Sequence, residues 1–305
     1  MARRIAVTGA NSALGRVLLQ RAVARADVEV VAIVRSERAE AELPALPRDR
    51  LRTARVDFRD AAGLREACAG ALGLIHLAGI LIESRNTSYV EANVETARAA
   101  IAAARGSSVP KLVLVSAIGA DPRSANPYWR SKGEAEALVR ESGSDYTIVR
   151  CPLLLACDGA GDRALAREVA GKIVPLPGGG ANLEQPLDAR DLSDGLLNAA
   201  LSRDCARGLV LDAVGPESLP LRELVKRGAR LRGTHPIILS VPTALLRAIL
   251  ALRTRLLGPG FSPEVIEVML ADTKLDPVPA AKALGIALRP LDETLAQSLA
   301  LASAA

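Results

Sequence analysis

The sequence predicts an α/β fold, a doubly wound parallel sheet followed by a small, mainly helical C-terminal cap. Short runs rich in Val, Ile and Leu recur through the first half without polar alternation, which is typical of parallel strands buried on both faces. Longer amphipathic runs separate them, as in βαβ units. A glycine-bearing turn joins the first apolar run to the first amphipathic run, in the strand–loop–helix order that opens many doubly wound sheets.

The predicted elements follow in order along the chain. Strands are expected at residues 5–8, 28–34, 51–56, 72–77, 111–116 and 146–150, and helices at 13–25, 61–69, 89–105 and 131–141. After residue 152, helices are expected at 219–231, 242–257 and 290–301, and a strand at 237–241. Residues 175–181, rich in Pro and Gly, are expected as a loop or turn. Residues 188–201 and 209–211 either belong to the cap or return to the sheet.

Composition excludes several classes of protein. Half of the 305 residues are apolar, which excludes a disordered chain. The net charge of +5 is spread along the chain without a basic cluster or interleaved aromatics, so no nucleic-acid partner is expected. Four scattered cysteines, with no CxxC motif and two distant histidines, predict no metal site and a reduced, cytoplasmic compartment. No apolar run reaches the ~18 residues of a transmembrane helix.

The turn after the first strand has the chemistry of a pyrophosphate site. Gly9 permits a tight turn, the helix N-terminus offers free N–H groups and the positive end of its dipole, and Gly15 allows close packing of helix on strand. Ser12 stands where the usual fingerprint has glycine, and its hydroxyl can donate to phosphate. An unliganded β–α turn is the alternative interpretation. The expected cofactor contacts in this loop are Thr8, Gly9, Asn11, Ser12, Ala13, Leu14, Gly15 and Arg16.

The end of the second strand favours NADP(H) over NAD(H). Sites for NAD(H) place an acid there to bind the ribose 2′-hydroxyl, whereas this chain has Arg35. The guanidinium groups of Arg35 and Arg16 match the oxygens of a 2′-phosphate. The alternative is that Arg35 is one of many surface arginines and that NAD(H) binds. These patterns predict a dinucleotide-binding Rossmann domain at residues 1–155. A substrate or cap region follows at 156–305, and some of its elements return to the sheet.

Further motifs carry a family resemblance. They are Val56-Asp57-Phe58, His76-Leu77-Ala78-Gly79, Asn93 within Glu91–Val94, Ser116 at a strand end, Tyr128-x-x-x-Lys132 and Arg150-Cys151-Pro152. With the Thr8–Arg16 loop, their order resembles the short-chain dehydrogenase/reductase superfamily, in its extended or atypical branch, over about residues 3–200. Residues 113–120 and 128–136 are most similar to the NADPH-binding accessory subunits of respiratory complex I and their bacterial relatives.

The resemblance implies a role for each of these residues. Asp57 and Phe58 would lie at the adenine side of the cofactor, Leu77, Ala78 and Gly79 at its ribose side, and Pro152 at the nicotinamide side. Ser116, Tyr128, Lys132 and Asn93 would form the catalytic set, with Asn93 as a structural or proton-relay residue. Asp188, Arg190 and Asp191 resemble a segment that ties the cap to the sheet.

The spacing of Tyr128 and Lys132 suits acid–base chemistry. Residues at i and i+4 share one helix face, and an ammonium beside a phenol favours the phenolate and lowers its pKa from ~10. Tyr128 could then exchange a proton with a carbonyl or alcohol whose oxygen also binds Ser116, while the cofactor carries the hydride. Lys132 could also hold the ribose hydroxyls.

Two functions therefore remain open. The first is an NADP(H)-dependent oxidoreductase acting on a carbonyl or alcohol of a small, apolar substrate, lipid-like, quinone-like or isoprenoid. The second is a non-catalytic NADPH-binding accessory or assembly protein of a membrane respiratory complex. The apolar, arginine-bearing segment 242–257 either forms a pocket wall or core, which we favour, or lies against an anionic membrane surface or membrane complex.

Overall fold

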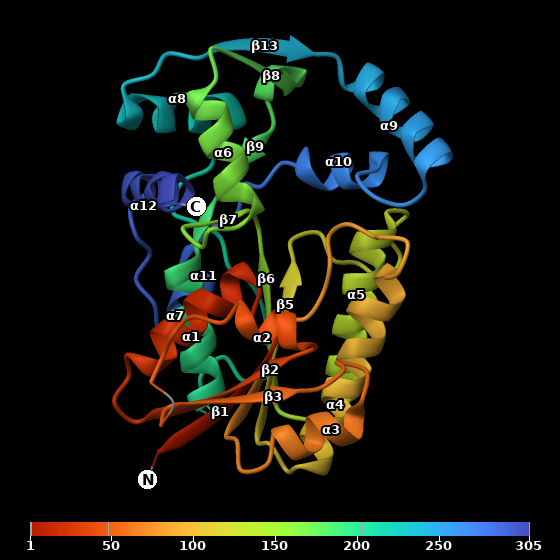
Figure 1. The fold of residues 1–305 in the computed structure, drawn as a ribbon, viewed down its shortest axis with the longest axis vertical. Coiled ribbons are helices and arrows are strands. Elements are labelled where there is room, and N and C mark those ends of the chain that lie inside the picture. The colour runs from red at the N-terminus through yellow and green to blue at the C-terminus, as the bar shows by residue number, and fades with distance from the viewer. Residues whose placement is uncertain (1, 48, 203, 305) are drawn as a thin grey trace.

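A seven-stranded parallel sheet forms the centre of the computed structural model, which describes residues 2–47, 49–202 and 204–304 (Figure 1). The strand order is β11-β6-β5-β4-β1-β2-β3. The order reverses between β1 and β4, and ligands bind doubly wound sheets beyond the carboxyl ends of the strands at such a point. The strands are β1 Arg3–Thr8, β2 Val28–Val34, β3 Leu51–Arg55, β4 Gly73–His76, β5 Lys111–Ala117, β6 Tyr146–Cys151 and β11 Leu209–Asp212.

Helices cover both faces of this sheet, which confirms the predicted fold class (Figure 1). One layer contains α1 (Ala13–Val23), α7 (Ala189–Leu201) and α11 (Val278–Leu284), and the other contains α3 (Ala61–Ala67), α4 (Thr96–Gly106) and α5 (Pro127–Glu141). Because successive strand residues point to opposite faces, Val7 packs into the first layer and Ala6 into the second. All six strands predicted for the first half are present, with ends that differ by at most two residues.

The C-terminal part forms a cap with its own small core. The helices α6 (Ala160–Ala170), α8 (Leu221–Arg232) and α12 (Leu291–Ala304) pack together around residues such as Leu165, Leu224 and Leu295. Two further helices, α9 (Thr243–Leu257) and α10 (Pro263–Met269), extend beside them. Three short strand pairs complete the cap: β7 (Leu154–Leu155) with β10 (Leu187–Asp188), β9 (Leu183–Glu184) with β12 (Leu219–Pro220), and β8 (Ile173–Pro177) with β13 (Ile237–Val241).

The sequence predicts α8, β13, α9 and α12 but misses four helices, α2 (Glu37–Ala41), α6, α10 and α11. Three of the four have seven residues or fewer, too short for a clear apolar period. The predicted loop at 175–181 is also partly wrong, because β8 runs through Pro175 to Pro177 and pairs in parallel with β13. Prolines are tolerated there because β8 has a partner on only one side.

Two helices of the first half differ from prediction at their beginnings. The segment expected as a helix at 89–105 starts with a π-helical turn, Val90–Glu95, which carries Asn93 and continues into α4. Such turns often occur at functional sites. Helix α5 begins at Pro127 rather than at residue 131, since Asn126 accepts a hydrogen bond from the Tyr128 amide as its N-cap.

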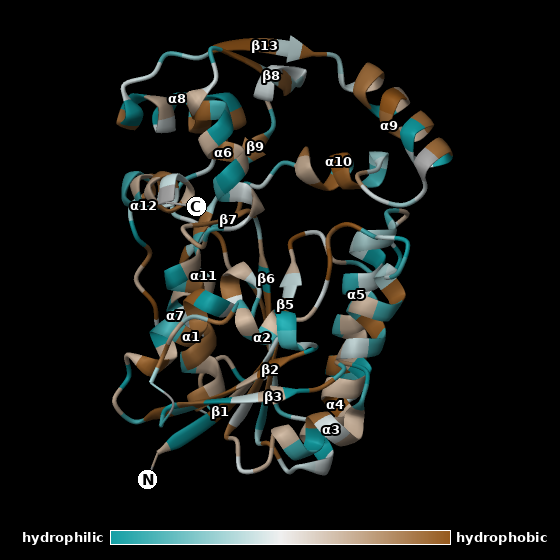
Figure 2. Cartoon of the chain, viewed as in Figure 1, coloured by the Kyte–Doolittle hydropathy of each residue, from teal (hydrophilic) through white to brown (hydrophobic). Residues whose placement is uncertain are grey.

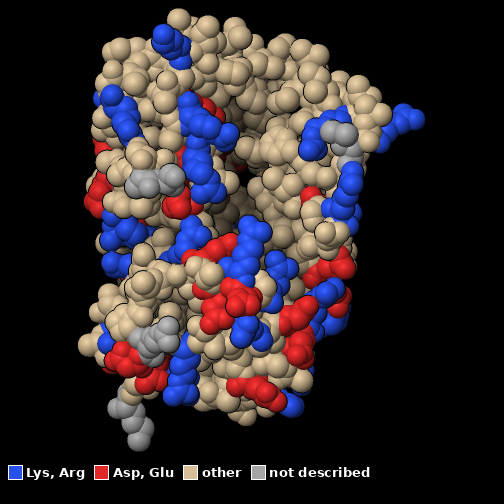
Figure 3. Space-filling view, in the orientation of Figure 1, with Lys and Arg blue, Asp and Glu red and all other residues tan. Residues whose placement is uncertain are grey.

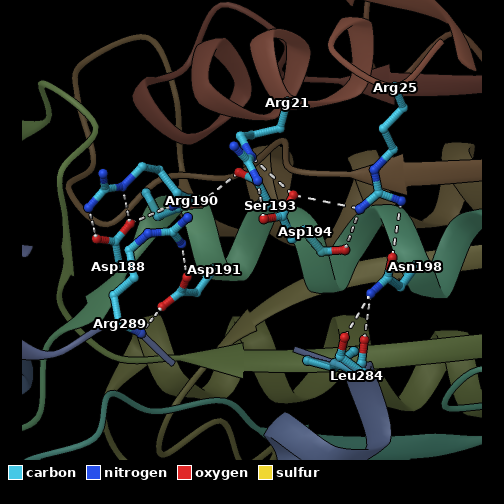
Figure 4. A network of polar contacts seen from close by, with 12 residues as sticks. Arg21, Arg25, Asp188, Arg190, Asp191, Ser193, Asp194, Asn198, Leu284 and Arg289 are labelled. Carbon is cyan, nitrogen blue, oxygen red and sulfur yellow. Dashed lines mark hydrogen bonds and ion pairs between the residues drawn. The ribbon is translucent and has the colours of Figure 1, made fainter. Parts of the chain in front are cut away.

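A polar network joins the cap to the sheet through α7 (Figure 4). Asp188 caps α7, forms an ion pair with Arg190 at 2.7 Å, and accepts a hydrogen bond from Thr294 of α12 at 3.0 Å. Asp191 accepts hydrogen bonds from the backbone and the guanidinium of Arg289. Both carboxylates are buried. They therefore hold α12 and its preceding segment against the sheet layer.

Helix α9 contradicts the favoured interpretation of segment 242–257 as pocket wall or core. Of its described side chains only Leu250 is buried, while Leu245, Ile249, Leu252 and Leu256 are exposed. The sequence could not distinguish these cases, because an apolar stripe looks the same whether another part of the chain covers it or not. Among the described residues, no helix has the length and apolar character needed to cross a bilayer.

Candidate functional site

The loop between β1 and α1 can be built only with glycine at two positions. Gly9 has a φ of +70°. A Cβ at this position would lie 3.1 Å from the amide nitrogen of Ala78, which follows β4. A Cβ on Gly15 would lie 2.5 Å from the Ala10 carbonyl oxygen. The loop backbone thus runs close to the next strand and to its own helix, as a pyrophosphate-binding turn requires.

Ser12 and Arg16 order this loop from within. The Ser12 hydroxyl accepts a hydrogen bond from the Gly15 amide at 3.0 Å and so caps α1, which leaves its proton free to donate elsewhere. The Arg16 guanidinium donates to the Asn11 carbonyl at 3.1 Å and forms an ion pair with Asp158. Arg16 is therefore held by protein groups. The other expected contacts, Thr8, Ala13 and Leu14, lie in the same turn.

Arg35 lies at the end of β2 with its side chain exposed, and its guanidinium carbon is 5.5 Å from the centre of the Phe58 ring. Asp57, beside Phe58, accepts a hydrogen bond from the Arg59 amide, and this bond holds the pKa of its carboxyl below the usual range. The structure thus brings Arg35, Asp57 and Phe58 together at one edge of the sheet. Phe58 is buried, so it is the exposed Arg35 guanidinium above its ring that can contact an adenine or a neighbouring phosphate.

Leu77, Ala78 and Gly79 continue β4 alongside the phosphate loop, and the Leu77 amide donates to the Thr8 carbonyl at 3.2 Å. At the end of β4, His76 Nδ1 lies 2.8 Å from the Thr8 hydroxyl. Burial, together with the nearby Lys132 charge, lowers the pKa of His76 to about 3. The imidazole is therefore neutral at physiological pH and acts as a structural hydrogen-bonding group.

Asn93 connects three segments of the site. Its side-chain oxygen accepts from the Ile80 amide at 2.9 Å, and its amide group donates to the Ser131 hydroxyl at 2.9 Å. A Cβ on Gly79 would lie 2.7 Å from this oxygen and 3.7 Å from Lys132 Nζ. Asn93 therefore positions the end of β4 against α5, which carries Tyr128 and Lys132.

Ser116 lies near the end of β5 with its side chain 3% exposed, and among the described residues its hydroxyl has no hydrogen-bond partner. The Cys151 thiol contacts the Ser116 carbonyl oxygen at 3.4 Å. A buried hydroxyl normally finds a partner, since leaving it unpaired costs about 1–3 kcal/mol. The unpaired hydroxyl of Ser116 is therefore free to bind an oxygen atom of a ligand.

Tyr128 packs against Tyr89, with ring centres 5.8 Å apart and planes inclined at 59°. Tyr89 is itself fixed by a hydrogen bond from its hydroxyl to the Leu81 carbonyl at 2.8 Å. Burial raises the pKa of the Tyr128 phenol above its usual range, and the neighbouring Cys151 and Tyr89 add to this effect. No role was predicted for Tyr89 from the sequence, and the tilted ring contact is what relates it to the site.

Lys132 departs from the sequence expectation. Its ammonium donates to the Val115 carbonyl at 2.9 Å, and burial lowers its pKa. The predicted lowering of the Tyr128 pKa is therefore wrong for the structure described, because burial raises this pKa and the Lys132 ammonium is not among the groups that shift it. The ammonium still contacts the carbonyl of the residue that precedes Ser116 in β5, so the structure brings Lys132 and Ser116 to the same end of this strand.

The loop after β7 lies beside the phosphate loop, because its Asp158 pairs with Arg16. Its conformation depends on a residue for which no role was predicted from the sequence. The buried Asp162 accepts hydrogen bonds from the amides of Ala156, Cys157 and Gly159, and from the Ser298 hydroxyl of α12. This network fixes the segment that follows Pro152 and places Asp158 beside Arg16. Its signal in the sequence is weak, since a Gly-x-x-Asp helix start is common.

The space-filling view shows a hollow between the cap and the sheet, with Lys and Arg side chains gathered below it (Figure 3). The glycine loop, the Arg35 surface and the Ser116–Tyr128–Lys132 set all belong to the carboxyl edge of the sheet, where the hollow lies. The residues present therefore fit a bound dinucleotide. Among the described residues, no group of His, Cys, Asp or Glu is arranged to hold a metal ion.

Comparison with known families decides the assignment. A family described as NAD(P)H-binding matches residues 9–172, which is more than half of the chain. The chain belongs to this family. The predicted resemblance to the extended short-chain dehydrogenases/reductases is thereby confirmed in the NAD(P)H-binding family and in the fold.

Two groups of known proteins are similar to the chain. Subunit 9 of the NADH dehydrogenase [ubiquinone] 1 alpha subcomplex is 26% identical over 255 residues in Arabidopsis thaliana and 28% identical over 246 residues in Rattus norvegicus. These matches cover 81% and 77% of this chain, which spans 62% and 63% of those relatives. Among solved structures, MoeE5 in complex with UDP-glucuronic acid and NAD has a TM-score of 0.76 at 20% identity, with 99% of both chains covered. The UDP-glucuronic acid 4-epimerase from Bacillus cereus, with NAD, has a TM-score of 0.75 at 16% identity, again over 99% of both chains. The likeness to the solved structures extends to the fold.

Proposed function

We propose that the chain is an NADP(H)-dependent oxidoreductase that transfers hydride between the nicotinamide and a carbonyl or alcohol carbon of a small, apolar substrate. The observation that carries this proposal is the buried, unpaired hydroxyl of Ser116 in β5. The Lys132 ammonium, from α5, bonds the carbonyl of the preceding strand residue, Val115. Cys151 connects Ser116 with Tyr128, because its thiol contacts the Ser116 carbonyl oxygen and it is one of the groups that raise the pKa of the Tyr128 phenol. In the proposed complex, the Ser116 hydroxyl and the Tyr128 phenol both bind a single substrate oxygen.

Each residue of this set has a distinct task. The bound cofactor supplies the hydride donor or acceptor. Ser116 donates a hydrogen bond to the substrate oxygen, and Tyr128 gives that oxygen a proton in reduction or takes one in oxidation. The phenol is protonated at neutral pH and can therefore give a proton in reduction, although its raised pKa makes it a weaker acid. Asn93 acts through its hydrogen bonds to Ile80 and Ser131 as a positioning residue.

The choice of NADP(H) rather than NAD(H) rests on Arg35. Arg16 pairs with Asp158, whereas Arg35 is exposed at the end of β2, where an acid would serve NAD(H). Arg35 is thus the cation available to a 2′-phosphate.

The proposal of an apolar substrate rests on the exposed side chains of Leu81 and Ile82, which adjoin Tyr89 at the site. The division into residues 1–155 and 156–305 and the cytoplasmic location stay predictions.

A second candidate is a non-catalytic, NADPH-binding accessory protein of a membrane respiratory complex. Two observations favour it. The curated relatives are named as subunits of NADH dehydrogenase. In addition, Lys132 is bound to the Val115 carbonyl and the pKa of Tyr128 is raised, so the phenol is not activated as in a working acid–base pair.

Single-turnover oxidation of bound NADPH, with a panel of apolar carbonyls and quinones, distinguishes the oxidoreductase from the non-catalytic accessory protein. For the enzyme, Tyr128→Phe should bind NADPH normally but react 100- to 10,000-fold more slowly, the usual range of general acid–base catalysis. Tyr146→Phe is the matched control, because Tyr146 begins β6 away from the carboxyl edge, and it should keep the full rate. Lys132→Met should weaken both binding and turnover.

The accessory role predicts another outcome for the same samples. No panel member would oxidise NADPH faster than background in any variant, and Tyr128→Phe would behave as wild type. NADPH would still raise the melting temperature, since a ligand that binds only the folded state stabilises it according to its concentration over its dissociation constant.

A further inference from the structure

The cap carries an apolar surface that no other part of the described chain covers. On α9, the side chains of Leu245, Ile249, Leu252 and Leu256 are 55%, 55%, 59% and 71% exposed. Their spacing of four, three and four residues places them within about 60° of one another around the helix. Leu250, on another face of α9, is buried and fixes the helix to the rest of the cap.

The strand pair that precedes α9 continues this surface. Ile173 of β8 and Ile237 of β13 are register partners, and both are more than 60% exposed. Leu239 lies two residues further along β13, on the same strand face, and is also exposed. Strand β13 ends at Val241, and α9 begins two residues later, so strand pair and helix lie along the same end of the molecule (Figure 1). Figure 2 shows hydrophobic colour along β13 and most of α9. We call Ile173, Ile237, Leu239, Leu245, Ile249, Leu252 and Leu256 the apolar platform.

The chain segment that carries most of the platform has charges of a single sign, although Lys226 and Arg227 in it pair with carboxylates outside it. Residues 224–263 contain seven Lys and Arg residues and no Asp or Glu. Arg253 and Arg255 lie roughly 80° to either side of the α9 stripe. Within the described ranges, neither they nor Arg247 pairs with a carboxylate, and Arg253 contacts the Phe261 carbonyl instead. A stripe of leucines between two arginines is the pattern of a helix lying in a bilayer interface, where long basic side chains reach the headgroups.

We propose that the apolar platform docks on the surface of a bilayer that contains anionic lipids. The absence of carboxylates over 40 residues fits anionic headgroups. A protein partner is a poorer fit, because protein interfaces are centred on Tyr, Trp and Arg, whereas the platform holds only Leu and Ile. Docking needs no membrane-spanning helix and does not depend on turnover, so it stands apart from the proposed function.

Sedimentation with vesicles tests the docking. The full chain, with and without NADPH, is mixed with vesicles of phosphatidylcholine alone or with about a third phosphatidylglycerol, and the bound fraction is measured against lipid concentration. We expect binding to the mixed vesicles, weak binding to phosphatidylcholine, and weaker binding as salt is raised. Replacing Arg255 by Gln should weaken binding by about fivefold.

Variants on the platform provide the decisive comparison. Leu252→Glu/Leu256→Glu should lower vesicle affinity by more than about tenfold while leaving the melting temperature unchanged, since both side chains are exposed. Val278→Glu is the matched control, because Val278 on α11 is equally exposed but lies outside the platform, and it should bind as wild type.

Three results would overturn the proposal. The first is wild-type protein that stays in the supernatant with every vesicle composition. The second is equal vesicle binding by wild type and Leu252→Glu/Leu256→Glu. The third is a wild-type dimer in analytical ultracentrifugation that the same double variant converts to a monomer without any lipid, which would assign the platform to a second copy of this chain.

Discussion

Arg150 and Glu136 form a bidentate ion pair that joins β6 to α5, with nitrogen–oxygen distances of 2.8 and 2.6 Å. Glu136 is completely buried and lies one turn after Lys132 on α5. The carboxylate raises the pKa of Arg150, which also donates to the Ala120 carbonyl. The pair thus holds the helix that carries Tyr128 and Lys132 in register with the strand that leads to Cys151.

Removing the charge of Glu136 should destabilise the fold. Glu136→Gln leaves the Arg150 guanidinium facing a neutral amide, and we expect the free energy of unfolding to fall by about 2–4 kcal/mol, because a buried pair is broken on one side only. Urea denaturation measures this change. Glu141→Gln is the control, since Glu141 ends the same helix on its exposed face and should change stability by less than about 0.5 kcal/mol. Equal stability of both variants would contradict a structural role for the pair.

Arg35→Ala should weaken NADPH binding selectively. Losing a charged partner of the 2′-phosphate costs about 1.5–3 kcal/mol, which corresponds to roughly 10- to 150-fold in the dissociation constant. NADH binding should change little, and calorimetric titration with both nucleotides measures the two effects. Arg38→Ala is a matched control three residues away, with a guanidinium that is 92% exposed and pairs with Glu42. If Arg35→Ala weakened both nucleotides equally, the assignment to NADP(H) would fail.

Gly15→Val should abolish cofactor binding. Even a Cβ at this position would approach the carbonyl oxygens of Ala10 and Gly9 to 2.5 and 2.6 Å, so the loop must open and its amides must move. Ser12→Gly should bind normally, since glycine is a tolerated N-cap and costs only a few tenths of a kcal/mol. Fluorescence titration with NADPH checks both variants. Loss of binding in Ser12→Gly would mean that the hydroxyl is an essential phosphate donor.

Stability should depend on pH through Glu184 in the cap. Burial raises the pKa of its carboxyl to about 7, and the negative charges of Asp272 and Glu168 add to this, while a hydrogen bond from Asn182 opposes it. The folded chain therefore keeps a proton that the unfolded chain releases near pH 4.5. The protonated Glu184 therefore contributes fully to the free energy of unfolding below pH ~4.5. This contribution, about 2–3 kcal/mol, is lost as the pH rises towards ~7.

Glu184→Gln isolates this effect. The variant keeps the hydrogen-bonding shape of the protonated acid and should remove the decline in stability between pH 5 and 7 relative to wild type. Denaturation at a series of pH values measures the difference between the two proteins, so that other titrating groups cancel. Parallel curves for wild type and variant would show that the Glu184 pKa is not raised in the folded chain.

Much of the fold and of the site could be predicted because the signals are local. The run from Ile5 to Gly15 specifies a buried strand, a turn that needs glycine and a helix start within a few residues. The four-residue spacing of Tyr128 and Lys132 likewise places them on adjacent turns of one helix. The short helices α2, α10 and α11 escaped prediction because so few residues give no distinct period.

The sequence by itself determined the class of sheet, the phosphate loop and the order of the site motifs. Only the tertiary structure decided that the Lys132 ammonium bonds Val115, that Asp162 fixes the loop beside Arg16, and that α9 stays exposed. The physical reason is that hydrogen-bond partners and burial depend on segments far apart in the chain. Asp162 and Ser298, which share a hydrogen bond, are 136 residues apart in sequence. An apolar stripe or a buried carboxylate acquires its role only when the packing around it is formed.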